Sequence, residues 1–254
     1  MVELVELSSQ AHQDLKVVPE EVIKFAASQH VLSISAQEIA NAATCFPVFA
    51  SRNQTNGAWG FSAMTSFTLA QNLFVQQSGW QTVFQPSSMK TYPLFLMESP
   101  ADKSQYTIGF DPTNVALSKT QGKDLFSAPG QASEHLSLVS QLLEGELAQI
   151  RHSFAFANKI DSLGLFKEVD LQVNYASGQT NTIKSLHTID EDKFKLLSAQ
   201  DLAELNELGY LMPIHGMLMS IYQLNVLINK HNSYEGNLPV NSVKMEITKG
   251  FTHS

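Results

Sequence analysis

The 254-residue sequence contains a single cysteine, Cys45, and only 16 lysine and arginine residues. One cysteine excludes an intrachain disulfide and a zinc site built from several thiolates, so the sequence favours a reducing compartment. The basic residues are dispersed among 24 acidic ones, which gives a net charge of −8. Binding to a phosphate backbone relies on clustered Lys and Arg, and we therefore expect no nucleic-acid partner.

Long hydrophobic runs are missing as well. The longest apolar-rich stretch, residues 217–228, is interrupted by Ser220 and Gln223 and falls short of the ~20 residues needed to span a bilayer. The N-terminal segment carries acidic Glu3 and Glu6 where a secretion signal has a basic start. These features predict a cytoplasmic protein with no membrane span.

Recognised catalytic motifs are absent too. The sequence contains no Gly-x-Gly-x-x-Gly, Walker loop, His-Glu-x-x-His, calcium-binding loop or Gly-x-Ser-x-Gly elbow. These motifs are the usual grounds for naming an enzyme from its sequence. Their absence makes a non-enzymatic protein the preferred interpretation, without a cofactor.

The elements that are present fall in two groups along the chain. Short β-rich segments separated by turn residues occupy 46–110 and predict an antiparallel meander. After a turn-rich stretch at 112–131, apolar residues spaced by three and four predict a long amphipathic helix over 132–162. The predicted core face of this helix is formed by Leu136, Val139, Leu143, Leu147, Ile150 and Phe154.

The C-terminal part of the sequence predicts a hairpin and two more helices. The segments 168–175 and 180–189 flank a four-residue turn and form the hairpin. The first helix follows Ser198 and the second opens at Pro213 and runs to about Lys230. Strands and helices are segregated, which favours an α+β fold: an antiparallel β-rich N-terminal half packed against a long helix, a hairpin and two C-terminal helices.

The length suits one domain, which we place at 1–231. An internal boundary near 112–131 is the alternative, because turn residues are concentrated there. Residues 232–254 are predicted to form a poorly packed tail with an optional strand at 243–248.

Histidines and carboxylates offer two kinds of chemistry. His12 and Asp14 have the spacing of two ligands in a non-haem iron facial triad, which would need Fe(II) and a third ligand from His135, His152 or His187. The simpler interpretation of His12 and Asp14 is a surface or packing role.

Acid/base chemistry is the second kind. His187 and Asp190 would form a base with its orienting carboxylate, and His215 would act from the first turn of an apolar helix. The simpler alternatives are solvated charges for the first pair and a buried or pocket-lining histidine for His215.

Aromatic residues concentrate in the β-rich half, as Trp59, Phe61, Phe67, Phe74, Trp80, Phe84, Tyr92 and Phe95. They either fill the core of the sheet or line a groove for a small molecule or peptide, with Trp80, Lys90 and Tyr92 near its rim. His215 is a further candidate ligand-binding residue. Met212, Met217 and Met219 either fill the core or form an adaptable partner surface.

Several short segments form a recognisable series along the chain: His12-Gln13-Asp14-Leu15, FPVF at 46–49, NLFV at 72–75, QPSSMKTYPLFL at 85–96, LGLFKE at 163–168, IDEDKF at 189–194 and PIHGMLMS at 213–220. In their order and spacing, over about residues 10–230, they resemble the bacterial SapC-like family. The sequence departs from the family pattern at 111–114 and at Lys90-Thr91, where the family has an acidic segment and a basic pair.

The resemblance implies no activity, cofactor or catalytic residue. The family is named after a member associated with a paracrystalline surface layer. We expect an accessory or binding protein whose partner is a small molecule such as an aromatic metabolite, a peptide or another protein. The alternatives are an iron or acid/base enzyme that uses His12 and Asp14 or His215, and a self-associating homo-oligomeric structural protein.

Overall fold

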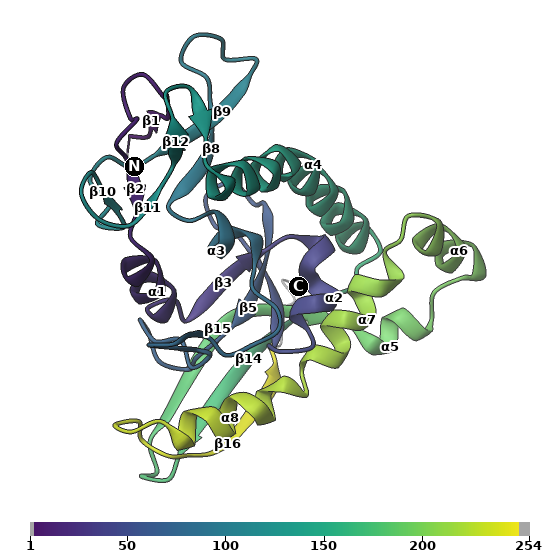
Figure 1. Ribbon diagram of the computed structural model, residues 1–254. Coiled ribbons are helices and arrows are strands. Elements are labelled where there is room, and N and C mark those ends of the chain that lie inside the picture. Colours follow the sequence, from purple (N-terminus) through teal and green to yellow (C-terminus); the bar gives the residue numbers. More distant parts are fainter. Residues whose placement is uncertain (1–2, 249–254) are drawn as a thin grey trace.

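The computed structural model describes residues 3–248 and is built around a six-stranded antiparallel sheet (Figure 1). The strand order is β16-β14-β15-β4-β5-β3. These strands are β3 (Val31–Ile34), β4 (Val48–Arg52), β5 (Trp59–Met64), β14 (Phe166–Tyr175), β15 (Thr180–Ile189) and β16 (Val240–Ile247). Helices that accompany an antiparallel sheet, without parallel βαβ units in this described range, confirm the predicted α+β class.

The helices flank this sheet and lie mostly in the second half of the chain. They are α1 (Pro19–Ala27), η1 (Ala36–Glu38), α2 (Ile39–Ala42), α3 (Ser87–Thr91), α4 (Glu134–Ser162), α5 (Glu191–Lys195), α6 (Ala199–Glu207), α7 (Leu211–Ser220) and α8 (Gln223–Ser233). Ser198 accepts a hydrogen bond from the Asp201 amide and caps α6, as its sequence predicts.

The remaining strands form small separate sheets, so the predicted single meander over 46–110 is wrong. β8 (Leu94–Glu98) and β9 (Tyr106–Phe110) pair with β1 (Val5–Glu6), and β2 (Lys16–Val17) pairs with β10 (Leu117–Ser118) and β11 (Lys123–Asp124). Two-stranded pairs are formed by β6 (Val75–Gln76) with β7 (Gly79–Trp80) and by β12 (Phe126–Ala128) with β13 (Gln131–Ala132). The chain leaves the main sheet after β5 because the strands β8 and β9 cover a core of their own.

The hairpin β14–β15 has the predicted position, and its register pairs Phe166 with Ile189 and Asn174 with Thr180. The optional strand expected at 243–248 is present as β16, which pairs along the outer edge of β14. Residues 240–247 are therefore part of the main sheet and not of a loosely packed tail. Residues 249–254 of that predicted tail lie outside the described part of the chain.

The helix α4 connects two hydrophobic cores. Leu136, Val139 and Leu143 in its first half belong to a smaller core formed with residues such as Leu94 and Leu125. Phe156, Ala157 and Ile160 in its second half belong to the main core. Figure 1 shows α4 as a long helix above the main sheet, reaching from the small sheets towards α7.

The predicted core face of α4 is therefore only partly correct. Leu136, Val139 and Leu143 are buried, but Ile150 and Phe154 are 54% and 61% exposed. The helix face that carries Ile150 and Phe154 continues the apolar spacing, but it lies beyond the end of the smaller core and does not face the main core. The buried positions then shift to Phe156 and Ile160.

One predicted C-terminal helix is two helices in the structure. α7 and α8 are bent by 42° relative to each other, and the first begins at Leu211, two residues before Pro213. The Ser220 hydroxyl donates to the Met217 carbonyl oxygen at 2.7 Å and accepts from the Val48 amide at 3.0 Å, which ties the end of α7 to β4. Over residues 3–248, no single helix is both long and apolar enough to cross a membrane, and only this bent pair together reaches that length and composition.

Candidate functional site

A hollow of about 330 Å³ lies between the middle of α4 and the β3–β5 end of the main sheet. Residues of β3, η1, the β5 strand with its preceding Ala58, α3 and α4 line it. These segments are far apart in the sequence and meet because α3 and η1 both contact α4. The hollow is thus located where α4 passes from one core to the other.

One face of α4 forms the longest wall of the hollow. Leu142, Glu146, Ile150 and Phe154 recur every four residues and are joined by Gln149 and Ser153. Residues at this spacing share one side of a helix, so a mixed polar and apolar stripe faces the cavity. Phe154 and Ile150 are the two large apolar side chains of this wall that stay mostly exposed.

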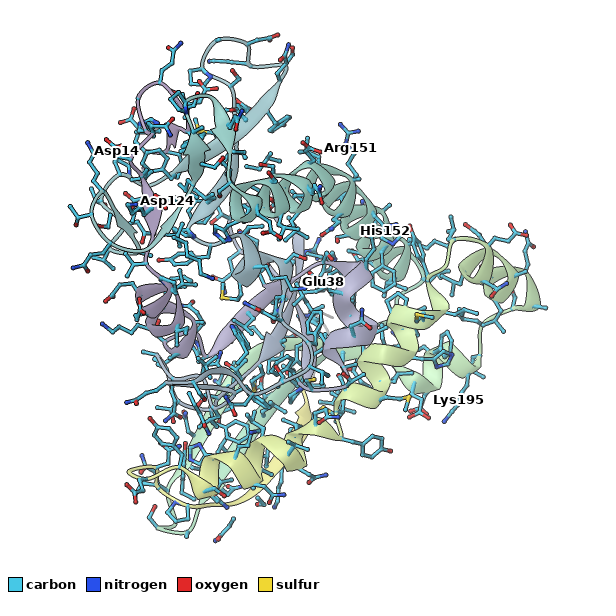
Figure 2. The ribbon with its side chains drawn as sticks, in the orientation of Figure 1. Asp14, Glu38, Asp124, Arg151, His152 and Lys195 are labelled. Carbon is cyan, nitrogen blue, oxygen red and sulfur yellow. The ribbon has the colours of Figure 1, made fainter. Side chains whose placement is uncertain are left out.

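Glu38 joins two of the other walls. Its Oε2 accepts from the Ser35 amide at 2.9 Å and from the Ser35 hydroxyl at 3.1 Å, and its Oε1 accepts from the Ser87 amide at 2.8 Å. Figure 2 shows Glu38 below α4, in the centre of the molecule. The carboxylate holds the start of α3 against η1.

Two serines of the lining also join neighbouring elements through hydrogen bonds. The Ser153 hydroxyl accepts from the Ala36 amide at 2.9 Å, which ties α4 to η1. The Ser88 hydroxyl donates to the Ser33 carbonyl oxygen at 3.0 Å, which ties α3 to β3. Glu146 and Gln149, by contrast, make no side-chain hydrogen bond or ion pair with any residue in the described range 3–248. Glu146 is therefore the carboxylate of the lining that stays without a partner among these residues, since Glu38 is bonded to Ser35 and Ser87.

The charge of the lining has one sign. Among residues 3–248, Glu38 and Glu146 are the ionisable residues of the lining, and no Lys, Arg or His of that range contributes to it. Burial raises the pKa of the Glu146 carboxyl, because the loss of water disfavours the charged form. Arg151 is the basic residue nearest in sequence, and Figure 2 shows it on the outer side of α4, away from Glu38.

Trp59 forms the wall at the sheet end of the hollow. Its ring packs against Phe166 with centroids 4.1 Å apart and edge-on against His187 at 4.8 Å, and the Arg52 guanidinium lies 5.5 Å from the ring centroid. Trp59 Nε1 and His187 Nδ1 are buried, and neither has a hydrogen-bond partner among residues 3–248. Burial lowers the pKa of His187, which keeps the imidazole neutral beside the indole.

The four ligand-binding residues predicted from the sequence lie outside this lining. Tyr92 is buried, with its ring stacked on Phe25 at 3.8 Å and its hydroxyl hydrogen-bonded to Asn114. Lys90 is exposed on α3, although its neighbour Thr91 lines the hollow. Trp80 pairs with Val75 and packs on the main core. The exposed His215 on α7 packs edge-on against Phe194 at 5.4 Å. Their role in binding stays a prediction.

The proposed iron ligands are not brought together. His12 Nδ1 accepts from the Ser8 amide at 3.1 Å, and the ring packs edge-on against Phe110. Figure 2 shows Asp14 and His152 well apart. Within the described residues, no group of three or more His, Cys, Asp or Glu side chains could hold a metal ion.

His187 and Asp190, the proposed acid/base pair, also make their contacts with different residues. Asp190 accepts from the Lys193 amide at 3.4 Å and so caps α5, and it forms an ion pair with Lys167 at 3.2 Å. His187 instead packs on Trp59. Asp190 is thus committed to the start of α5 and does not orient the imidazole.

Sequence reasoning missed the α4 wall of the hollow. The apolar spacing assigns Ile150 and Phe154 to the core and gives no role to the polar residues Glu146 and Gln149 beside them. The signal that could have found the wall is the polar stripe of Glu146, Gln149 and Ser153, which runs directly beside this apolar one. A helix that faced either core or solvent alone would not mix the two so closely.

Comparison with known proteins adds one finding. No curated protein and no solved structure was found to match the chain. A family model described as SapC matches residues 7–227, which is most of the 254 residues and includes every element that lines the hollow. The chain therefore belongs to the SapC family.

Proposed function

We propose that this SapC-family protein is a non-enzymatic binding protein that holds a small, largely apolar molecule in the hollow under α4. The observation that carries the proposal is a cavity of about 330 Å³ with apolar walls and a few uncommitted polar side chains, Glu146 and Gln149 among them. Ligand sites usually have volumes of roughly 300–1,000 Å³ and combine apolar walls with a few polar groups. The volume favours a compact metabolite over a peptide.

The exposed apolar side chains at the mouth support this proposal. Ile150 and Phe154 are 54% and 61% exposed, although they lie at positions that match the core-facing spacing of α4. Removing apolar surface from water contributes about 25 cal/mol per Å². A bound molecule that covers these two side chains would gain this contribution.

The chemistry of the lining favours binding over catalysis. Two of its serines, Ser88 and Ser153, are bonded to backbone groups, and among residues 3–248 no histidine lines the hollow beside its serines to act as a base. A nucleophile needs such a base within hydrogen-bonding reach. The acid/base candidate His215 lies on α7, outside the lining.

The test is a substitution on the α4 wall that fills the hollow with a larger side chain. We expect Ile150→Trp to abolish binding of small aromatic probes, because the larger side chain occupies the space between α4 and the sheet. The measurement is saturation-transfer NMR with indole, benzyl alcohol, benzylamine and benzoate as separate probes. At least one probe should receive saturation from the wild-type protein and lose it in the variant.

Leu138→Trp is the matched control, since Leu138 is 56% exposed on the same helix but does not line the hollow. This variant should bind the probes as the wild type does. The proposal is contradicted if no probe binds the wild-type protein, or if both tryptophan variants bind equally well.

A further inference from the structure

The hollow contains an uncompensated negative charge. Of its two carboxylates, Glu38 already accepts three hydrogen bonds, from the Ser35 amide, the Ser35 hydroxyl and the Ser87 amide. Glu146 accepts none from residues 3–248, and it forms no ion pair with them. A half-buried carboxylate without a partner costs free energy that a cation of matching size would recover.

The charged groups around Glu146 do not supply that cation. Arg151 points outward from α4 (Figure 2), and the exposed Lys90 on α3 does not line the hollow. Arg52 lies over Trp59 and donates to the Gly57 carbonyl oxygen at 3.1 Å. His152 packs edge-on against Tyr210 with centroids 5.5 Å apart. The other acidic neighbour on the helix, Glu144, is exposed.

Apolar side chains flank the carboxylate on its own helix. Leu142 lies one turn before Glu146, and Ile150 and Phe154 lie one and two turns after it. On the sheet side, Ile34 and Phe61 complete the apolar lining. A ligand in this position would present a cationic head to Glu146 and an apolar body to these side chains.

We propose that the hollow binds a small organic amine, with Glu146 as the counter-ion of its ammonium group and α4 covering its apolar body. This inference rests on the proposed binding function and names its ligand class. Anionic ligands are disfavoured, because both ionisable residues of the lining are acidic and no basic residue of the range 3–248 lines the hollow to pair with an anion.

Three isosteric probes test the sign of the charge directly. At pH 7.5 we expect benzylamine to bind at least about tenfold more tightly than benzyl alcohol, because a hydrogen bond to a charged group is roughly twice as strong as a neutral one. Benzoate should bind more weakly than either. The dissociation constants are measured by titration in NMR or by calorimetry.

The Glu146→Gln variant removes the charge and keeps the shape. It should weaken benzylamine binding by about tenfold and leave benzyl alcohol binding unchanged. Glu144→Gln is the matched control: it makes the same charge change two residues away on the exposed side of α4, and it should leave both affinities unchanged.

The pH dependence gives an independent result. Burial raises the pKa of Glu146 above its ordinary value of 4.5, and benzylamine stays protonated over pH 4.5–7.5. Its affinity for the wild-type protein should therefore rise with pH as Glu146 loses its proton, and it should not change in Glu146→Gln. If benzyl alcohol binds as tightly as benzylamine and Ile150→Trp abolishes both, the amine inference is wrong and the binding function stands. If no probe binds in the hollow, the binding function itself is wrong.

Discussion

At the scale of single residues, His231 shows how burial fixes a charge state. It is 1% exposed, its Nε2 lies 3.1 Å from the Leu238 carbonyl oxygen, and the Asn237 amide nitrogen lies 3.2 Å from its Nδ1. This pattern fits a neutral ring that donates from Nε2 and accepts at Nδ1. The histidine thereby joins α8 to the segment that leads into β16.

Burial lowers the pKa of His231 from its ordinary value of 6.5, and the bond to Leu238 only partly opposes this. The unfolded chain therefore binds the proton more readily than the folded protein, so stability is complete above pH 6.5 and is lost as the pH falls towards the folded pKa. We expect the free energy of unfolding in urea to decrease between pH 7.5 and 5.

His231→Gln should make that decrease shallower, although burial also lowers the pKa of His135 and His187, which leaves part of the slope. His215→Gln, at an exposed position of α7, is the control and should leave the slope as it is. An unchanged slope in His231→Gln would show that this residue does not contribute.

At the scale of elements, α4 contains a correctable weakness. Gly145 lies in the interior of this 29-residue helix, where glycine costs conformational entropy. A Cβ built at this position would contact only Gln149 Nε2, at the ordinary distance of 3.8 Å. Gly145→Ala should therefore raise the free energy of unfolding by about 0.5–1 kcal/mol.

Chemical denaturation measures this change. The mirrored substitution Ala148→Gly, at an exposed position of the same helix, should lower the free energy of unfolding by a similar ~1 kcal/mol. Equal effects of the same sign from the two variants would contradict the entropic explanation.

The sequence predicts elements well where the information is local. The hairpin alternation places Val169, Leu171 and Val173 on one buried face, and Gly164 and Gly209 adopt the left-handed φ values of 64° and 72° expected after α4 and α6. The break between α7 and α8 was not predictable, because the Ser220 hydroxyl bonds to Val48, 172 residues away in the sequence.

The hollow was not predictable for the same reason. Its walls are held by long-range contacts such as Ser87 with Glu38 and Ala36 with Ser153, which no periodic pattern encodes. The aromatic first half contributes Trp59 and Phe61 to the lining, and the aromatic groove expected from the sequence stays a prediction. The rim residues Trp80, Lys90 and Tyr92 lie elsewhere.

At the scale of the whole molecule, the two cores share one helix. Leu143 of the smaller core and Ile160 of the main core both lie on α4 and are fully or almost fully buried. Leu143→Ala and Ile160→Ala should each cost about 2–5 kcal/mol. Because α4 belongs to both cores, either substitution should lower the midpoint of one common unfolding transition.

Tryptophan fluorescence provides the measurement, since Trp59 and Trp80 both pack against the main core. Leu143→Ala should shift the fluorescence transition as far as the transition seen by far-UV circular dichroism. A fluorescence midpoint that stays in place while a second transition appears in circular dichroism would show two independent units, and it would place a domain boundary inside α4.

The position of the hollow along α4 has a mechanical consequence. The helix is packed at both ends, against the smaller core at Leu136–Leu143 and against the main core at Phe156–Ile160, and the cavity lies beside the segment between these two contacts. A ligand slightly too large for the space would have to bend α4, because neither end of the helix can move without disrupting a packed core. Selection by ligand size would then depend on the stiffness of one helix more than on the outline of the cavity.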